Sequence, residues 1–156
     1  MTTPTKALLL SVHPQYAEAI LLGTKTVEIR RRRVAVEPGI PLILYGTSPT
    51  KALLGAARIV TVEVGHPDAI WELHHEHVGV DRVVYDRYVQ AAPEVTALGI
   101  GEPIAFAEPI PLARIRRALE FRPPQSYQYV SDSFVRDLVL RHPVAEQLMR
   151  LMTESQ

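Results

Sequence analysis

The residues best suited to chemistry lie between Gly23 and Arg30, where a lysine, a glutamate and an arginine occur within one short segment. Residues 26–31 alternate between polar and apolar types, which predicts a strand with Glu28 and Arg30 on the same face. There Glu28 could accept a hydrogen bond from the exocyclic amine of a base, and Arg30 could hold a phosphate in a bidentate fork. The alternative is a surface strand whose two charged side chains only pair in solvent, at a gain of at most about 1 kcal/mol.

Three more arginines, Arg31, Arg32 and Arg33, follow directly. Adjacent guanidinium groups repel one another, and a bound polyanion would relieve that repulsion. If the strand continued, Arg30 and Arg32 would face one side and the other two arginines the opposite side. One pair is therefore expected on the surface that holds the glutamate, which favours a phosphate-binding function for this segment.

A helix is expected to position this segment from its amino-terminal side. Apolar residues recur at helical spacing after Pro14 and through Leu22, and Gly23 should end the helix as a left-handed C-cap. Further helices are expected over residues 67–75, with Asp68 as the cap, over 81–90, and over 131–152 with an interruption at Pro143.

Strands are expected at 6–12, 26–31, 40–45, 52–64 and 98–110, because apolar alternation there is bounded by turn residues. The fourth should bend near Gly55, and the last should break at Pro103. The 156 residues are 47% apolar, enough to bury the core of one domain over residues 1–156, in which 131–156 form a C-terminal helical extension. The order of elements predicts an α+β fold, a small mixed β-barrel with helices packed outside.

The formal net charge is zero, but the charges are unevenly distributed. Residues 1–60 hold eight Lys and Arg against three Asp and Glu, residues 61–110 hold two against nine, and residues 111–156 hold seven against five. A neutral total argues against a protein that coats nucleic acid non-specifically. A basic first third is compatible with a localised phosphate-binding face.

Several classes of mechanism and location are excluded by composition. The absence of cysteine excludes disulfides, thiolate nucleophiles and cysteine-bound zinc. No apolar run approaches the roughly 18 residues of a membrane span, and the amino terminus lacks the pattern of a signal peptide. We therefore expect a cytoplasmic protein with no membrane partner.

The histidines allow two interpretations. His74 and His77 could share a helix face, but a cluster on one segment without a further ligand elsewhere is weak support for a metal site. We assign no metal and expect no cofactor. His13 precedes the first helix, where it could donate to a phosphate, act as a general base, or simply begin the helix.

An aromatic segment near the carboxyl end could contribute to binding. Phe121, Tyr127 and Tyr129 could stack on bases, and Gln125 and Ser126 could contact base edges. The neighbouring cations are Arg114, Arg116, Arg117 and Arg122. The alternative is that Pro123 and Pro124 form a rigid strap which the tyrosines pack against the domain.

The pattern Gly-x-Lys-x-x-Glu-x-Arg, formed here by Gly23, Lys25, Glu28 and Arg30, resembles the ASCH domain family, which has a PUA-like barrel fold. The similarity extends over roughly residues 6–130 and includes segments that resemble a bacterial and archaeal branch of PUA-like proteins described as predicted transcriptional regulators. The other segments that carry it are Thr47–Pro49, Ala52–Gly55, Ile70–Glu72, Pro109–Leu112 and Pro123–Tyr127.

This resemblance implies a cleft between barrel and helices, lined by the motif, in which relatives engage RNA or another nucleic acid. Some relatives act instead as enzymes, among them an amidohydrolase that removes the acetyl group from N4-acetylcytidine and proteins described as ribonucleases. In the amidohydrolase pattern a threonine stands three residues after the lysine. Here Glu28 stands at that spacing after Lys25, which argues against the deacetylase.

Two hypotheses of different classes remain open from the sequence, and a third, a regulator that senses a small nucleotide-like ligand, fits the same cleft. The first is a module, with a regulatory role, that binds single-stranded or structured RNA or DNA. Its expected contact residues are Gly23, Lys25, Glu28, Arg30, Arg31, Arg32, Arg33, Gln125, Ser126 and Tyr127. The second is an enzyme that acts on a modified nucleoside, such as an N4-acylcytidine, or on RNA, with Lys25 and Glu28 as its acid–base pair.

Overall fold

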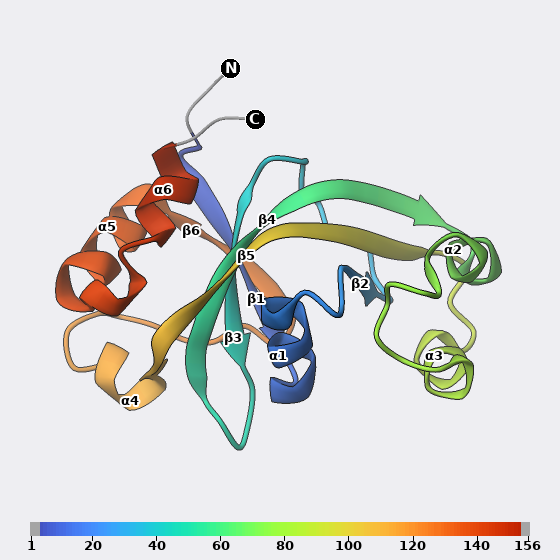
Figure 1. The fold of residues 1–156 in the computed structure, drawn as a ribbon, viewed down its shortest axis with the longest axis horizontal. Coiled ribbons are helices and arrows are strands. Elements are labelled where there is room, and N and C mark those ends of the chain that lie inside the picture. The colour runs from blue at the N-terminus through green and yellow to red at the C-terminus, as the bar shows by residue number, and fades with distance from the viewer. Residues whose placement is uncertain (1–3, 154–156) are drawn as a thin grey trace.

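A twisted sheet of six strands forms the frame of the protein (Figure 1). The computed structural model describes residues 4–153. The elements along the chain are β1 (Lys6–Val12), α1 (Pro14–Leu22), β2 (Val27–Arg30), β3 (Pro41–Gly46), β4 (Ala52–Gly65), α2 (Pro67–His74), α3 (Arg82–Val89), β5 (Val95–Pro111), α4 (Leu112–Ile115), β6 (Tyr127–Ser131), α5 (Asp132–Arg141), the 3-10 helix η1 (Pro143–Ala145) and α6 (Leu148–Thr153). Within residues 4–153, no helix has both the length and the apolar character that crossing a bilayer requires.

The strand order is β2-β5-β4-β3-β1-β6, in which β1 and β3 pair in parallel and the other neighbours pair antiparallel. The mixed α+β class is therefore confirmed. The closed barrel is wrong, because in the described part of the chain the edge strands β2 and β6 do not pair with each other. β2 has only four residues, and side-chain contacts described below, rather than a backbone ladder, connect it to the other edge.

The strand β1 is buried on both faces of the sheet. Ala7 and Leu9 belong to one apolar cluster, whereas Leu8 and Leu10 belong to another. Residues of a strand alternate between faces, so a strand with two covered faces needs a continuous apolar run. This explains why the Ala7–Leu10 segment shows no polar alternation.

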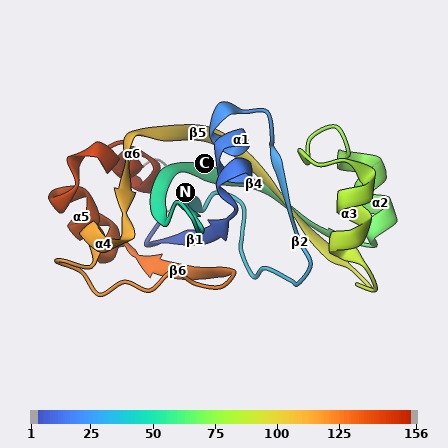
Figure 2. The same ribbon diagram turned by 90° about the horizontal axis from the view of Figure 1, so that it is seen from below.

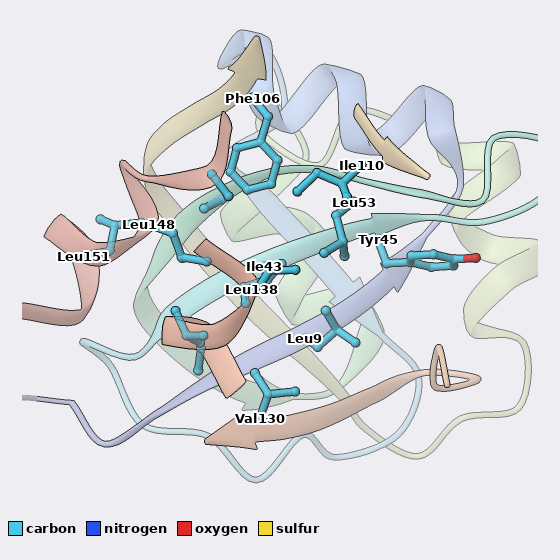
Figure 3. Close-up of a cluster of buried hydrophobic side chains, with 14 of the residues drawn as sticks. Leu9, Ile43, Tyr45, Leu53, Phe106, Ile110, Val130, Leu138, Leu148 and Leu151 are labelled. Carbon is cyan, nitrogen blue, oxygen red and sulfur yellow. The ribbon is translucent and has the colours of Figure 1, made fainter. Parts of the chain in front are cut away.

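The C-terminal helices form part of the largest core cluster (Figure 3). Leu138 of α5 and Leu148 and Leu151 of α6 are fully buried against the sheet. The predicted terminal helix is divided, as expected, at Pro143, which cannot donate a backbone N–H and begins η1. The segment that we described as an extension therefore contributes to the core over its described residues.

Two further clusters lie on the other side of the molecule. In the first, α1 packs Ala17 and Ile20 against β1, β3, β4 and β5. In the second, α2 and α3 cover β2 and the far ends of β4 and β5, which extend well beyond the rest of the sheet (Figures 1 and 2). Ile70, Tyr85 and Val89 are its buried helical residues. The long β4–β5 ribbon thus carries α3 to a position opposite α1.

The strand β2 ends at Arg30 rather than at Arg31. Thr96 faces Arg30 across the ladder, and β5 begins at Val95, so β5 offers almost no backbone for further pairing. Arg31 to Arg33 follow in a bend and loop. The predicted alternation of arginines on two strand faces is therefore wrong.

Two other local predictions differ from the structure. Pro103 does not break β5, because it lies in an irregularity of the ladder with β4, where a missing N–H is tolerated. The cap of α2 is His66, whose Nδ1 accepts from the N–H of Asp68 at 3.1 Å, and Asp68 itself lies in the first turn. Near Gly55, where we expected a bend, the ladders of β4 with β3 and β5 shift their register.

We expect Gly55→Ala to destabilise the domain by about 1–3 kcal/mol or more, because a Cβ there would lie 2.4 Å from the carbonyl oxygen of Ile104 and 2.6 Å from Cδ2 of Leu21. Urea unfolding measures the change. Gly65→Ala, at the other end of β4, is the control, since its Cβ would meet only ordinary contacts with Ile70; its expected effect is within about 0.5 kcal/mol. Equal stability of the two variants would contradict the close packing of α1 on the β4 irregularity.

Candidate functional site

Gly23 sets the direction in which the chain leaves α1. Its φ of 85° is the left-handed conformation expected of a C-cap, and its N–H contacts the carbonyls of Ala19 and Ile20. The N–H groups of Thr24 and Lys25 also donate to the carbonyl of Ala19. The chain therefore turns sharply, and Lys25 stands directly before β2.

Lys25, Glu28 and Arg30 form a buried ion triad. Oε1 of Glu28 lies 3.2 Å from Nζ of Lys25, and Oε2 of Glu28 lies 2.9 Å from both Nε and Nη2 of Arg30. The exposed fractions of the three side chains are 4%, 10% and 12% in sequence order. The triad thus holds one net positive charge where little water reaches, and its field is screened less than that of a surface charge.

Both cations of the ion triad also bind distant parts of the chain. Nζ of Lys25 donates to the carbonyl of Val78 in the segment before α3. Nη2 of Arg30 donates to the carbonyl of Ser11 at 2.9 Å, and Nη1 donates to Oγ of Ser126 at 3.3 Å. Arg30 therefore connects β2 to β1 and to the residue before β6, across the open side of the sheet.

A cavity of about 380 Å³ lies beside the ion triad. Its polar lining residues are the triad together with Ser11, His13, Thr47 and Gln125. Its apolar and aromatic lining residues are Val12, Tyr16, Ile29, Val78, Val80, Val84, Tyr85 and Tyr88. A cavity that combines charged and hydrogen-bonding groups with aromatic rings suits a flat, polar ring.

The segment between α2 and α3 is fixed to β2 by its backbone. The N–H groups of Thr26 and Val27 both donate to the carbonyl of His77 at 3.0 Å. Gly79 has a φ of 73°, and a Cβ at that position would lie 3.1 Å from Cβ of Lys25. The close approach of this segment to Lys25 therefore requires glycine.

The two tyrosines of α3 have different roles. Tyr85 is 1% exposed and its hydroxyl donates to the carbonyl of Pro67 at 2.7 Å. Burial raises the pKa of Tyr85, with Arg82 opposing the rise, so this hydroxyl is a protonated structural donor. Tyr88 is 45% exposed, and its hydroxyl accepts from the N–H of Arg31 at 3.3 Å. Its ring therefore remains accessible to a ligand in the cavity.

Four of the residues named from the sequence line the cavity, namely Lys25, Glu28, Arg30 and Gln125. His13 also lines it; the residue precedes the first turn of α1 without a side-chain cap bond, and its ring meets Tyr16 edge to face at 5.9 Å. Sequence reasoning missed the aromatic and apolar wall. The available signal was the placement of Val84 and Tyr88 one helical turn apart.

The remaining predicted residues lie outside the cavity lining. Gly23 caps α1, and Ser126 accepts from Arg30. Nη2 of Arg31 donates to the carbonyl of Gln90 at 2.7 Å, whereas Arg32 and Arg33 are exposed.

The aromatic residues near the carboxyl end are engaged in packing. Phe121 stacks on Phe134 at 5.8 Å between ring centroids and belongs to the core. The hydroxyl of Tyr127 accepts from the N–H of Ala35 at 3.4 Å, and the hydroxyl of Tyr129 donates to the carbonyl of Ala35. These tyrosines hold the loop before β3 in place, through Ala35 rather than through the proline pair of the packing alternative.

Replacing Glu28 with glutamine should destabilise the domain by about 3–5 kcal/mol, because Lys25 and Arg30 would keep their charges in a buried site without a counter-charge. Equilibrium unfolding in urea measures the loss. Asp86→Asn makes the same chemical change in an exposed pair with Arg82 and should cost less than about 1 kcal/mol. Equal losses for the two variants would contradict a stabilising role for the buried ion triad.

Comparisons with known proteins identify relatives with the same arrangement of elements. A curated protein from Zymomonas mobilis subsp. mobilis, named an ASCH domain-containing ribonuclease, is 28% identical over 137 residues, which cover 86% of this chain and 90% of that protein. The crystal structure of ASCH from Zymomonas mobilis has a TM-score of 0.80 at 26% identity, over 86% of this chain and 94% of that one. The structure of human THYN1 shares the fold, with a TM-score of 0.56 at 15% identity, over 88% of this chain and 98% of that one.

The family model of the ASCH domain matches residues 10–104, a range that contains the ion triad, α3 and most of the cavity lining. This match extends over more than half of the chain. The protein therefore belongs to the ASCH domain family.

Proposed function

We propose that this ASCH domain binds nucleic acid, RNA or DNA that is single-stranded or structured, and holds one unstacked base in the cavity beside the ion triad. The observation that carries the proposal is the cavity itself. It is lined by a buried carboxylate, two cations and aromatic rings. Its volume of about 380 Å³ suits a small ring system.

The polar lining residues of the cavity offer the contacts that a base edge needs. Oε2 of Glu28 accepts from two nitrogens of Arg30, whereas Oε1 contacts only Nζ of Lys25 in the triad and retains a lone pair for the exocyclic amine of a base. The amide of Gln125 can both donate and accept. Tyr16 on α1 and Tyr88 on α3 add ring surface to the lining, against which a base could stack.

Flanking phosphates would meet the arginines that follow β2. Arg32 and Arg33 are exposed beside Arg31, which is itself held near the cavity by its bonds to Tyr88 and Gln90. Because the formal net charge of the whole chain is zero, such contacts would be local to this face.

Two relatives support a nucleic-acid partner. The Zymomonas mobilis protein is named a ribonuclease, and a ribonuclease must bind RNA. The human THYN1 structure, whose likeness concerns the fold alone, is a complex with DNA that contains 5-methylcytosine. The ion triad and the cavity are the features of this chain through which we propose the same class of partner.

A second candidate function is hydrolysis of RNA or of a modified nucleoside, and the name of the Zymomonas mobilis relative favours it. Lys25 and Glu28 lie in the cavity with their charged atoms 3.2 Å apart, as an acid–base pair would require. The test is incubation of labelled RNA and of N4-acetylcytidine with the wild type and with a Glu28→Gln variant shown by circular dichroism to be folded. Product that requires Glu28 would support an enzyme. Equal product from both proteins, or none, would leave binding, with its proposed regulatory role, as the function.

Tyr88→Ala should weaken binding of a single-stranded RNA by about 1–3 kcal/mol, because a base in the cavity would lose one stacking surface. Tyr88→Phe keeps the ring and should bind nearly as the wild type does. Val83→Ala, on the same helix but outside the cavity lining, is the control for effects on α3. Fluorescence anisotropy measures all four proteins. Unchanged affinity in Tyr88→Ala would refute the placement of a base against this ring.

A double variant, Arg32→Gln with Arg33→Gln, should reduce the slope of log K against log salt by about 1.4, since two phosphate contacts to a single strand would be lost. Both side chains are exposed, so the fold should be unaffected. The measurement is the same anisotropy titration at several salt concentrations. Arg136→Gln serves as the control, because Arg136 lies on α5 and pairs with Asp132. A wild-type slope in the double variant would remove these arginines from the proposed interface.

A further inference from the structure

A second basic groove lies at the opposite end of the molecule from α3. It is about 740 Å³ in volume and is formed by α4, the end of α5 and the start of η1. Figure 1 shows α4 and α5 at one end of the ribbon and α3 at the other, and the groove and the cavity share no lining residue. Any ligand of this groove therefore needs an explanation separate from the ion triad.

Three arginines line this groove. Arg114 lies in α4, Arg117 lies two residues after its end, and Arg141 ends α5. All three are exposed, and within residues 4–153 none of them takes part in an ion pair, unlike Arg136 on the same helix α5. Glu108 is the single carboxylate among the lining residues. The groove therefore carries an excess of positive charge that the described part of the chain does not neutralise.

The position of His142 indicates that arginines from different elements face the same part of the groove. It lines the same groove, and its ring Nε2 is buried without a hydrogen-bond partner in the described part of the chain. Burial, together with Arg114 and Arg141, lowers the pKa of His142. Two guanidinium groups from different elements thus act on one imidazole, and the side of the groove that holds the histidine is short of negative charge.

We propose that this groove is a second anion site, in which Arg114, Arg117 and Arg141 hold the phosphate groups of a nucleic-acid backbone. Guanidinium groups bind phosphate oxygens through parallel N–H donors, and three of them around one groove can contact more than one phosphate. The choice of a nucleic acid as the source of the phosphates rests on the proposed function, whereas binding of phosphate does not.

The first experiment tests the anion site without nucleic acid. Inorganic pyrophosphate is titrated into the wild type while the histidine C2–H signals are followed by NMR; the His142 signal is the one missing from His142→Gln. A bound anion should shift this signal and move its titration to higher pH. The shift should be lost in Arg114→Gln/Arg117→Gln/Arg141→Gln and kept in Arg136→Gln. No shift, or an equal shift in the triple variant, would overturn the anion site.

The second experiment identifies the source of the phosphates. A single-stranded RNA of about 12 nucleotides, which suits the size of one small binding domain, is titrated into the same proteins and into Tyr88→Ala. We expect the triple variant to lower affinity about tenfold or more and to reduce the salt slope by about 2, with Arg136→Gln near the wild type.

The outcomes separate this inference from the proposed function. RNA binding that is weakened in Tyr88→Ala but unchanged in the triple variant would overturn the groove as an RNA site while the cavity stands. A His142 shift with pyrophosphate, together with no binding of RNA or of single-stranded DNA of the same sequence by the wild type, would restrict the anion site to small phosphate compounds and refute the proposed function.

Discussion

A single buried carboxylate, Glu28, determines the geometry of the cavity end of this domain. It lies between Lys25 and Arg30, and each of these cations binds the backbone of another segment, Lys25 at Val78 and Arg30 at Ser11. A buried charge is stable only when it is paired and hydrogen-bonded. The ion triad therefore fixes the positions of the segments that contain Val78 and Ser11. The cavity therefore owes its shape to charge as much as to apolar packing.

The ion triad and the cavity lie where the open sheet leaves its two edges unpaired in the described part of the chain. In a closed barrel, the backbone of β2 would pair with the other edge and fill the space between them. Here Arg30 from β2 reaches Ser11 of β1 and Ser126 before β6 through its side chain, and the cavity lies beside that connection, lined by Gln125. The departure from the expected barrel and the existence of the site are thus consequences of the same short strand.

The sequence predicted those features that depend only on residues close together in the chain. Gly23 as a helix cap and the shared face of Glu28 and Arg30 follow from local spacing, and the structure confirms both. Features that depend on distant partners were missed. The end of β2 is decided by where β5 begins, and Tyr88 reaches the cavity only because the long β4–β5 ribbon carries α3 there. Periodicity within one segment contains no information about such contacts.

Because the C-terminal helices contribute to the core, they limit how far this domain can be shortened and still fold. The matched region, residues 10–104, ends inside β5 and omits Val130, Leu138 and Leu148, which are among the buried residues that cover one face of the sheet. A fragment cut to those limits would expose that face to water and lose residues 105–111 of β5, an inner strand of the sheet. The unit recognisable by sequence is therefore smaller than the unit that folds, and excision of the matched region alone would yield an aggregating polypeptide rather than a working module.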